Sequence, residues 1–536
     1  MQMPARTVIL FFALTAPAVV TAAATDLGAK VANQGTPEGV APCMTCHGPD
    51  GGGMAPTAYP RIAGLNADYM ARQLRDFRAG KRNSPVMMPM AANLTDAEIT
   101  AVAAYYAAMP IPAAVARAPE KDVAKTAPDL VQWGDWRGRG LPGCAQCHGP
   151  DGNGIGSGFP GIAGQHASYL KAQLHAWKNG ARSNDPFGLM KSVAERLTDA
   201  EIDVLADYYA SAPGGAPTPA ENVPMSVAAD VVVAAGDVHT GDVPQQGAPP
   251  AGRNPGAGGY FQPPSRDALP DGPFGEAVSR GQAIFKNTNI HPESSKYVGN
   301  DQACANCHID AGRLARSAPL WASWIAYPAY RSKNKKVNTY IERIQGCFTY
   351  SMNAQASSAG GPPAADSETI VSLVAYSFWL AKGAPTGDSA MPGRGYPRLE
   401  ETEHGFDPER GAAVYAAKCA LCHGGDGAGV TYSDGRTLFP PLWGAESYNW
   451  GAGMHKIDTA AAFVKHNMPL GMGDSLTDQD AWDVAAFMNS HERPQDPRYQ
   501  GDLAKTTTQF HGGKFDYYGT RKAADGKLLG ERSAVE

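Results

Sequence analysis

Four copies of one five-residue motif, C-x-x-C-H, occur in this chain of 536 residues and account for eight of its nine cysteines. The two thiols of such a motif are spaced to form thioether bonds with one haem, and the next histidine is placed to ligate the iron. A zinc or redox C-x-x-C site does not require that histidine. We therefore predict four covalently bound haem c groups. The predicted attachment cysteines are Cys43, Cys46, Cys144, Cys147, Cys304, Cys307, Cys419 and Cys422. The predicted proximal iron ligands are His47, His148, His308 and His423.

The first residues have the pattern of a secretory signal peptide. Arg6 precedes an apolar run over residues 8–20, and three consecutive alanines ending at Ala24 follow. A membrane anchor is the alternative, but the run is shorter than the roughly 18 residues that such a span needs. We expect residues 1–24 to be removed, which places the mature chain in the periplasm without a membrane span.

Length and charge narrow the possible classes of protein. A chain of 536 residues exceeds the usual size of one domain, so we expect several. The net charge is -6 and charged residues make up 18% of the chain, which argues against a nucleic-acid partner held by general electrostatics. An anionic substrate would need a local basic pocket.

The first two motifs open segments that repeat each other. CHGPDGGG and LTDAEITAVAAYYA in the first recur as CHGPDGNG and LTDAEIDVLADYYA in the second, which indicates tandem homologous domains over residues 25–112 and 113–213. Each is expected to contain a middle helix, over residues 67–77 or 167–177, and a last helix that starts near Thr95 or Thr198. Residues 27–213 resemble dihaem cytochromes of the c4 type.

The second half contains two further cytochrome-like domains, predicted over residues 267–388 and 389–510. Before them, residues 214–266 are rich in Pro, Gly and Ala and form a predicted linker, in which VAADVVVAA is either one strand or part of a disordered tether. Helices are expected over residues 276–285, 367–380, 409–417 and 478–489. The polar tail, residues 511–536, is expected to be peripheral. The predicted fold class is mainly α, with four cytochrome c-like domains in tandem and two dihaem halves joined by the linker.

A second axial ligand for each iron is expected downstream in the same domain. Alignment of the LTDAEI segments places Met87 opposite Met190, and these two are the predicted ligands, with Met88 and Met90 as the alternatives in the first domain. In the fourth domain the predicted ligand is Met468, which lies 49 residues after Cys419, compared with 44 between Cys43 and Met87. His466 and Met472 are the competing candidates there.

The ninth cysteine, Cys347, lies 43 residues after Cys304, where the other domains have methionine. We predict that it ligates the third iron; otherwise Met352 takes that role and a free thiol remains in an oxidising compartment. A thiolate ligand lowers a haem potential and is a nucleophile toward sulfur, which points to sulfur redox chemistry. Cations that could hold an oxyanion surround it in the sequence: Arg313, Arg316, Arg331, Lys333, Lys335, Lys336 and Arg343.

Several longer motifs of the second half carry a family resemblance. YVGNDQACANCHIDAGRLA, AYPAYRSKN, IERIQGCFTYSMNAQ, FPPLWGAESYNWGAGMH and AAFMNSHERPQDPR are similar to the dihaem thiosulfate dehydrogenases, also called tetrathionate reductases. With the c4-like half, the chain resembles a fusion of that enzyme to its dihaem electron acceptor. The resemblance implies conversion of two thiosulfates into tetrathionate and two electrons, in either direction, with a soluble or membrane-attached periplasmic acceptor.

The same resemblance implies a set of site residues. Cys347 would be the catalytic ligand, and Arg331, Arg343 and Ser351 would contact sulfonate groups. The alternative role of Arg343 is a salt bridge to Glu342 or to a haem propionate. Some family members have lysine before the distal methionine of the second enzyme haem, but Asn467 stands there in this chain.

Two other functions fit part of the sequence. One is a thiosulfate-conjugating cytochrome of sulfur oxidation, which needs separate partner proteins. The other is a non-catalytic electron-transfer chain in which Cys347 only tunes the haem potential.

Overall fold

The structure is a computed structural model with two compact units, residues 1–113 and 114–536. No helix in the part of the chain that it describes is long and apolar enough to cross a membrane. The predicted signal peptide before Val19 and the segment VAADVVVAA lie outside the described residues. Those residues are 19–112, 121–136, 139–217, 259–388, 390–523 and 525–531, with only the backbone described for 19–25 and 121–126.

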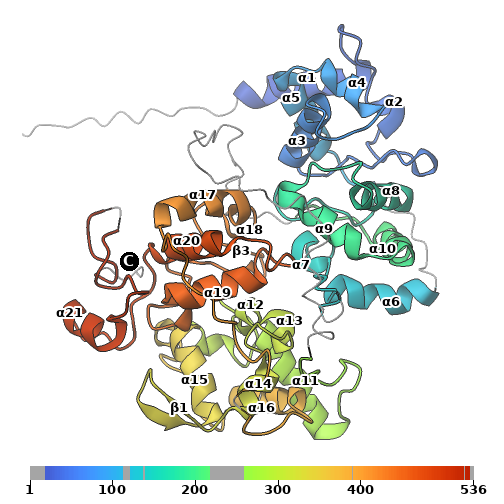
Figure 1. Cartoon of the computed structure of the whole chain (residues 1–536). Coiled ribbons are helices and arrows are strands. Elements are labelled where there is room, and N and C mark those ends of the chain that lie inside the picture. The colour runs from blue at the N-terminus through green and yellow to red at the C-terminus, as the bar shows by residue number, and fades with distance from the viewer. Residues whose placement is uncertain are drawn as a thin grey trace, which may run out of the picture. The chain divides into compact units, whose positions relative to one another are not determined.

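The first compact unit contains the first predicted domain and is built from helices around one core (Figure 1). Its core includes Val31 on the first helix and Ile99, Val102 and Tyr106 on the last. The fold class is therefore confirmed as helical here. The elements are α1 (Val19–Gln34), α2 (Met44–His47), η1 (Ala55–Thr57), α3 (Ala67–Arg78), α4 (Met87–Ala92) and α5 (Asp96–Ala107).

The second predicted domain opens the other compact unit and repeats the helix order of the first. Leu130 from its opening helix packs with Ile202, Leu205 and Tyr209 from its closing helix. Its elements are α6 (Lys121–Gln132), α7 (Ala145–His148), α8 (Ala167–Lys178), η2 (Pro186–Gly188), α9 (Leu189–Arg196) and α10 (Asp199–Ser211).

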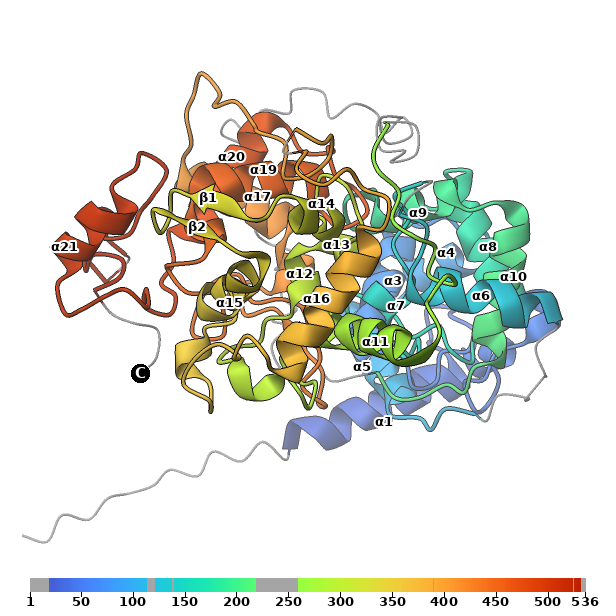
Figure 2. The same ribbon diagram turned by 90° about the horizontal axis from the view of Figure 1, so that it is seen from below.

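The third predicted domain combines helices with a short antiparallel hairpin. Figure 2 shows α11 (Gly272–Lys286) beside α16 (Glu368–Leu380), with the hairpin next to α15 (Tyr340–Tyr350). In the hairpin Ala329 pairs with Asn338 and Arg331 with Lys336. The other elements are η4 (Ser295–Tyr297), α12 (Cys304–Cys307), α13 (Ile309–Gly312), α14 (Leu320–Ile325), β1 (Ala329–Arg331), β2 (Lys336–Asn338) and η5 (Ala354–Ala356).

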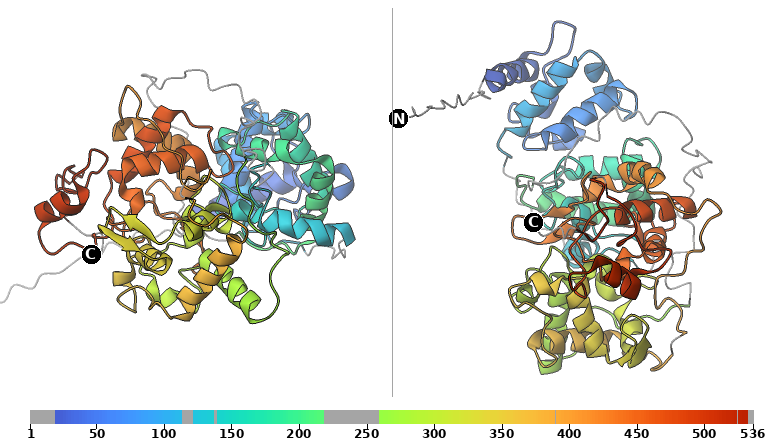
Figure 3. Two further views of the ribbon diagram at one scale, coloured as in Figure 1. Left: turned by 60° about the horizontal axis from the view of Figure 1, so that its bottom comes forward. Right: turned by 90° about the vertical axis from the view of Figure 1, so that its left-hand side faces the viewer.

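The fourth predicted domain is the bundle of orange and red helices in Figure 3. Tyr415 from its first helix packs with Val464 and Val484 from its last two. Its elements are α17 (Pro408–Lys418), α18 (Ala420–His423), β3 (Val430–Thr431), β4 (Thr437–Phe439), η6 (Gly453–His455), α19 (Ile457–Asn467) and α20 (Asp478–Asn489), followed by α21 (Leu503–Thr506) and the π-helical turn η7 (Thr507–His511).

The opening and closing helices of three domains cross at a glycine. At each crossing a Cβ atom on the glycine would collide with a backbone carbonyl of the facing helix, so only glycine permits the approach. The glycine and carbonyl pairs are Gly28 with Ala101, Gly281 with Ser372, and Gly411 with Asp483.

The predicted helices are present, and side-chain caps fix where several begin. Thr95 and Thr198 each accept a hydrogen bond from the backbone of a glutamate three residues later, whose carboxylate bonds back to the threonine N–H. Ser367 caps α16 in the related one-way manner. These caps satisfy backbone N–H groups that have no partner within the helix, so a Thr-Asp pair in this sequence marks the start of a helix.

The expectation of a peripheral tail is wrong. Tyr518 and Leu529 are fully buried against Trp450 of the fourth domain, and His511 and Asp516 are buried beneath them. The tail contains few apolar residues, but the ones it has are spaced to cover one side of that domain. Because charged residues separate these apolar residues, the sequence of the tail shows no apolar pattern from which the packing could be predicted.

Residues 114–536 also join domains that are distant in the sequence. Phe159 of the second domain lies 5.4 Å from Phe439 of the fourth, ring centroid to ring centroid, in a cluster that includes Cys147 and Cys422. Arg196 donates a hydrogen bond to the carbonyl of Gly471. The second haem-attachment loop therefore packs against the fourth.

Candidate active site and haem-binding segments

Each predicted proximal histidine has one ring nitrogen held by the backbone. The Nδ1 atom faces a carbonyl oxygen at 2.6–3.0 Å in all four domains. A neutral imidazole that donates from Nδ1 presents the lone pair of Nε2 to a metal, which is the usual arrangement of metal-bound histidine. The accepting carbonyls belong to Pro60, Pro160, Ala318 and Pro440.

This donor set fits covalently attached haem c. In every domain the two thiols of the motif lie on one helical turn with the histidine at or just beyond its end. Burial lowers the pKa of His308 to about 4, so its ring is neutral and able to ligate. The described residues thus supply two thiols and one imidazole nitrogen to each of four groups.

The third attachment segment differs from the other three in its backbone. Asp310, Ala311, Arg316 and Ala318 all have positive φ values, between 47° and 64°. The loop that follows His308 is consequently tighter, and its carbonyl comes from the residue before a proline rather than from the proline itself. The motif alone does not reveal this difference.

The predicted methionine ligands stand at helix ends. Met87 is the first residue of α4, Met190 lies in the first turn of α9, and Met468 follows the last residue of α19. Among the alternatives, Met90 packs against the core of the first domain. These positions agree with the predicted roles, which remain predictions.

The rivals of Met468 have other partners. His466 Nδ1 lies 2.6 Å from a carboxylate oxygen of Asp474 and 2.6 Å from the guanidinium of Arg316. Met472 packs in the cluster that joins the second and fourth domains. Lys465 donates to the carboxylate of Asp478, so it is engaged away from a ligand role.

Cys347 has an arginine as its direct neighbour. The Nη1 atom of Arg343, one turn earlier on α15, donates to the Cys347 Sγ atom at 2.9 Å. The negative charge that Cys347 carries when ionised raises the pKa of Arg343 above its ordinary value. Glu342, one of the alternative partners of Arg343, instead forms an ion pair with Lys336. The pair brings a cationic donor directly against the sulfur atom.

Cys347 also lies near the third attachment motif. Burial raises the pKa of Cys304 to about 12 and that of Cys307 to about 11, and the nearby Cys347 adds to both shifts. Met352, the alternative ligand, is only 4% exposed and belongs to the core of the third domain. This arrangement favours Cys347 over Met352 as the distal ligand of the third iron, which remains a prediction.

The other predicted substrate residues, Arg331 and Ser351, are connected to the Arg343–Cys347 pair through Tyr327 and through the backbone of α15. Arg331, at the end of β1, donates to the Tyr327 hydroxyl, and the Tyr327 phenol in turn influences the pKa of Arg343. Ser351 caps the end of α15, where its N–H donates to the Cys347 carbonyl at 2.8 Å. The hairpin and the end of α15 thus bring these groups to one region.

A half-buried lysine, Lys333, joins the same group of charges. Lys333 Nζ lies 3.5 Å from the ring centroid of Tyr350 and donates to the carbonyl of Gly451. Burial, with the nearby charges of Arg498 and Arg343, lowers the pKa of Lys333 to about 7. This lysine can therefore change its charge near neutral pH.

Arg498 was not singled out by the sequence, although it lies in the motif ERPQDPR. It is bonded to Asp496 through Nε at 2.9 Å, and its guanidinium lies over the rings of Tyr350 and Phe510. Three of the remaining cations near Cys347 in the sequence have other partners. Arg316 binds Asp474, Lys336 binds Glu342, and Arg313 donates to the Pro264 carbonyl.

Comparison with known proteins agrees with the helical domains. The family model for cytochrome c matches residues 28–109, 141–213 and 408–492. A thiosulfate dehydrogenase of Stutzerimonas stutzeri (strain A1501) is 54% identical over 279 residues, which are 52% of this chain and 87% of that protein. A thiosulfate dehydrogenase electron acceptor of the same organism is 45% identical over 186 residues, 34% of this chain and 85% of that protein.

A solved structure is similar to nearly the whole chain. The thiosulfate dehydrogenase of Marichromatium purpuratum, in its as-isolated form, superposes with a TM-score of 0.81 at 48% identity. The match covers 95% of this chain and 99% of that one. Both halves of the chain therefore have a counterpart within one solved chain.

Proposed function

Since this chain belongs to the thiosulfate dehydrogenase family, we propose that it is a periplasmic tetrahaem enzyme that joins two thiosulfate ions into tetrathionate and releases two electrons. The contact between Arg343 and Cys347 beside the third attachment motif carries this proposal. It provides a stabilised sulfur nucleophile next to a redox centre. The proposed haem domains are residues 25–112, 113–213, 267–388 and 389–510, after a signal peptide over residues 1–24.

The four C-x-x-C-H motifs would hold the haems, with the distal ligands Met87, Met190, Cys347 and Met468. When bound, haem c supplies the one-electron acceptors that the oxidation requires. The remaining steps depend on how Cys347 bonds the sulfur atoms and how nearby cations offset the negative charge of the thiosulfates.

The sulfur chemistry is assigned to Cys347. Its thiolate forms a sulfur–sulfur bond with the sulfane sulfur of one thiosulfate, giving a cysteine S-thiosulfonate and two electrons. The sulfane sulfur of a second thiosulfate then attacks the sulfur that is bonded to Cys347 Sγ, and the Sγ–S bond breaks. Tetrathionate leaves and the Cys347 thiolate returns, so atoms and charge balance over the cycle.

The surrounding cations offset the charge of two dianions. Arg343 would be shared between the thiolate and the substrate, while Arg331 and Ser351 would bind sulfonate oxygens. Lys333 would add a charge from a half-buried position. Without such groups, bringing two thiosulfates beside a thiolate would be strongly unfavourable.

The contacts between domains support an exit for the electrons. Ile309 and Leu314 of the third domain share a core with the fourth. Burial, together with the nearby Cys147 of the second domain, raises the pKa of Cys422 of the fourth domain. The c4-like half would thus act as a built-in acceptor before an external one. Attachment in one chain keeps its effective concentration high.

Two variants of Cys347 test the reaction. Cys347→Gly should keep all four haems and lose nearly all thiosulfate turnover with ferricyanide as acceptor. Cys347→Met restores a thioether ligand but no nucleophile, so it should also be inactive. As a matched control, Met352→Leu changes a buried sulfur residue five positions after Cys347 and should stay active. Full turnover in Cys347→Met would show that Cys347 only tunes the haem potential and would refute its role as nucleophile.

A further inference from the structure

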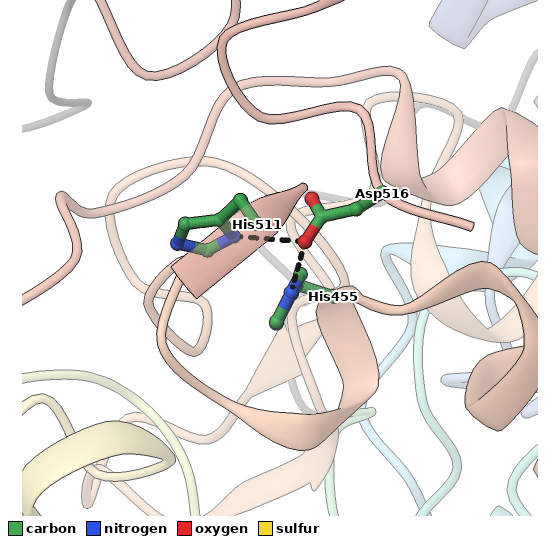
Figure 4. A group of neighbouring side chains, drawn as sticks. All are labelled: His455, His511 and Asp516. Atoms are coloured by element: carbon green, nitrogen blue, oxygen red, sulfur yellow. Dashed lines mark hydrogen bonds and ion pairs between the residues drawn. The ribbon is translucent and has the colours of Figure 1, made fainter. Parts of the chain in front are cut away.

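A second cluster of titratable side chains lies where the tail packs on the fourth domain. His455 Nε2 is 2.8 Å and His511 Nδ1 is 2.9 Å from the same carboxylate oxygen, Asp516 Oδ2 (Figure 4). The three side chains are between 0% and 4% exposed. They come from η6, η7 and the loop after η7, so the tail completes the cluster.

The second nitrogen of each ring is also directed at an oxygen. His455 Nδ1 faces the carbonyl of Ala452, and His511 Nε2 lies 2.8 Å from the Asp496 carboxylate. A neutral imidazole carries only one N–H, yet all four ring nitrogens face acceptors. Hydrogen bonds alone would satisfy the cluster only if it held two further protons, either on the rings as imidazolium ions or on the carboxyl groups.

Two imidazolium ions would repel each other here. The ring centroids of His455 and His511 are 4.9 Å apart in a site closed to water, where like charges interact strongly. A divalent cation could take the place of the two protons that point at Asp516 Oδ2. The exchange leaves the total charge unchanged and makes both rings neutral.

We propose that His455 Nε2, His511 Nδ1 and Asp516 Oδ2 bind a divalent transition-metal ion, zinc in particular. Two imidazoles and one carboxylate are a common zinc donor set, and a water molecule would complete a tetrahedron. Ligand atoms of one zinc lie about 3.4 Å apart, so the rings would move outward by about 0.5 Å.

The atoms around the cluster already orient these ligands. The Ala452 carbonyl and the Asp496 carboxylate fix the two rings through their outer nitrogens, and the Tyr518 N–H donates to Asp516 Oδ1 at 3.1 Å. Such outer hydrogen bonds are typical of metal-bound histidine and carboxylate. A metal here would fasten the tail to the fourth domain.

The test uses the full haem-loaded chain, matured in zinc-supplemented medium and dialysed to remove loosely bound ions. We expect about one zinc per chain by mass spectrometry, and at least a roughly tenfold lower content in Asp516→Asn, which keeps the size of the side chain. The control is His404→Gln, which removes an exposed histidine of the same domain and should leave the zinc content unchanged.

A second measurement covers the case in which Asp516→Asn fails to fold. A strong chelator should lower the melting temperature of the wild-type protein, and zinc but not magnesium should restore it. Wild-type protein that carries no zinc, takes up none on addition and melts at the same temperature with or without chelator would overturn the proposal.

Discussion

Arg343 and Cys347 face each other one turn apart on α15, with the guanidinium Nη1 atom 2.9 Å from the thiol sulfur. The pair sits beside the third attachment motif, while Glu342, the residue next to the arginine, is bound to Lys336. Arg343 therefore hydrogen-bonds directly to the sulfur atom, and its removal should affect the sulfur chemistry more than the fold.

Replacing this arginine tests that relationship. A hydrogen bond to a charged group is worth about 1.5–3 kcal/mol, so Arg343→Met should lower kcat/KM for thiosulfate by roughly 10- to 150-fold. Steady-state assays measure the effect, and the haem content should not change. Arg398→Met is the matched control, because Arg398 is 85% exposed and pairs only with an exposed glutamate. Equal activity in both variants would exclude a role for Arg343.

The lowered pKa of Lys333 predicts that substrate binding depends on pH. Its pKa is lowered to about 7, so it is charged below that pH and neutral above it. An anionic substrate binds better to the charged form, and KM for thiosulfate should therefore rise as pH increases through about 7. Because the bound anion favours the ammonium, the midpoint should move upward at saturating substrate.

The matching variants isolate this titration. Lys333→Met should have a high KM at all pH values and lack the change near pH 7, while Lys335→Met, at an exposed position two residues on, should keep the wild-type profile. A profile unchanged in Lys333→Met would assign the pH dependence to another group.

The fourth domain allows a test of its distal ligand. Met468→Gly should remove the sulfur-to-iron charge-transfer band of one haem and slow electron exit more than substrate binding. Met472→Leu preserves the apolar packing between the second and fourth domains and should keep the band. If the band survives in Met468→Gly but disappears in Met472→Leu, the ligand is Met472.

A measurement of haem content tests the prediction that the chain binds four haem c groups, on which the proposed reaction depends. Fully matured protein, denatured in alkaline pyridine, should report about four haems c per chain, because each motif supplies both thioether bonds. Replacing Cys419 and Cys422 together should remove one of them. A count of three in the unaltered chain would show that one motif stays empty.

Much of the architecture could be predicted because its causes are local. A haem-binding pentapeptide, a Thr-Asp helix start or a repeat of LTDAEI depends on residues that are neighbours in the chain, and their helices lie where they were expected. The position of Cys347 relative to Cys304 followed from the same regular spacing. The backbone carbonyl that orients each proximal histidine was not predicted, since carbonyls are common to all residues.

Contacts between distant segments could not be predicted in this way. Seven cations surround Cys347 in the sequence, but the folded chain directs Arg313 and Arg316 elsewhere and brings in Arg498 from over a hundred residues away. His455, His511 and Asp516 likewise meet only because a few apolar residues dock the tail. The sequence determines which chemical groups are present and how they are spaced locally. Which groups become buried and which charges pair depends on the tertiary packing, because packing decides which surfaces are removed from water.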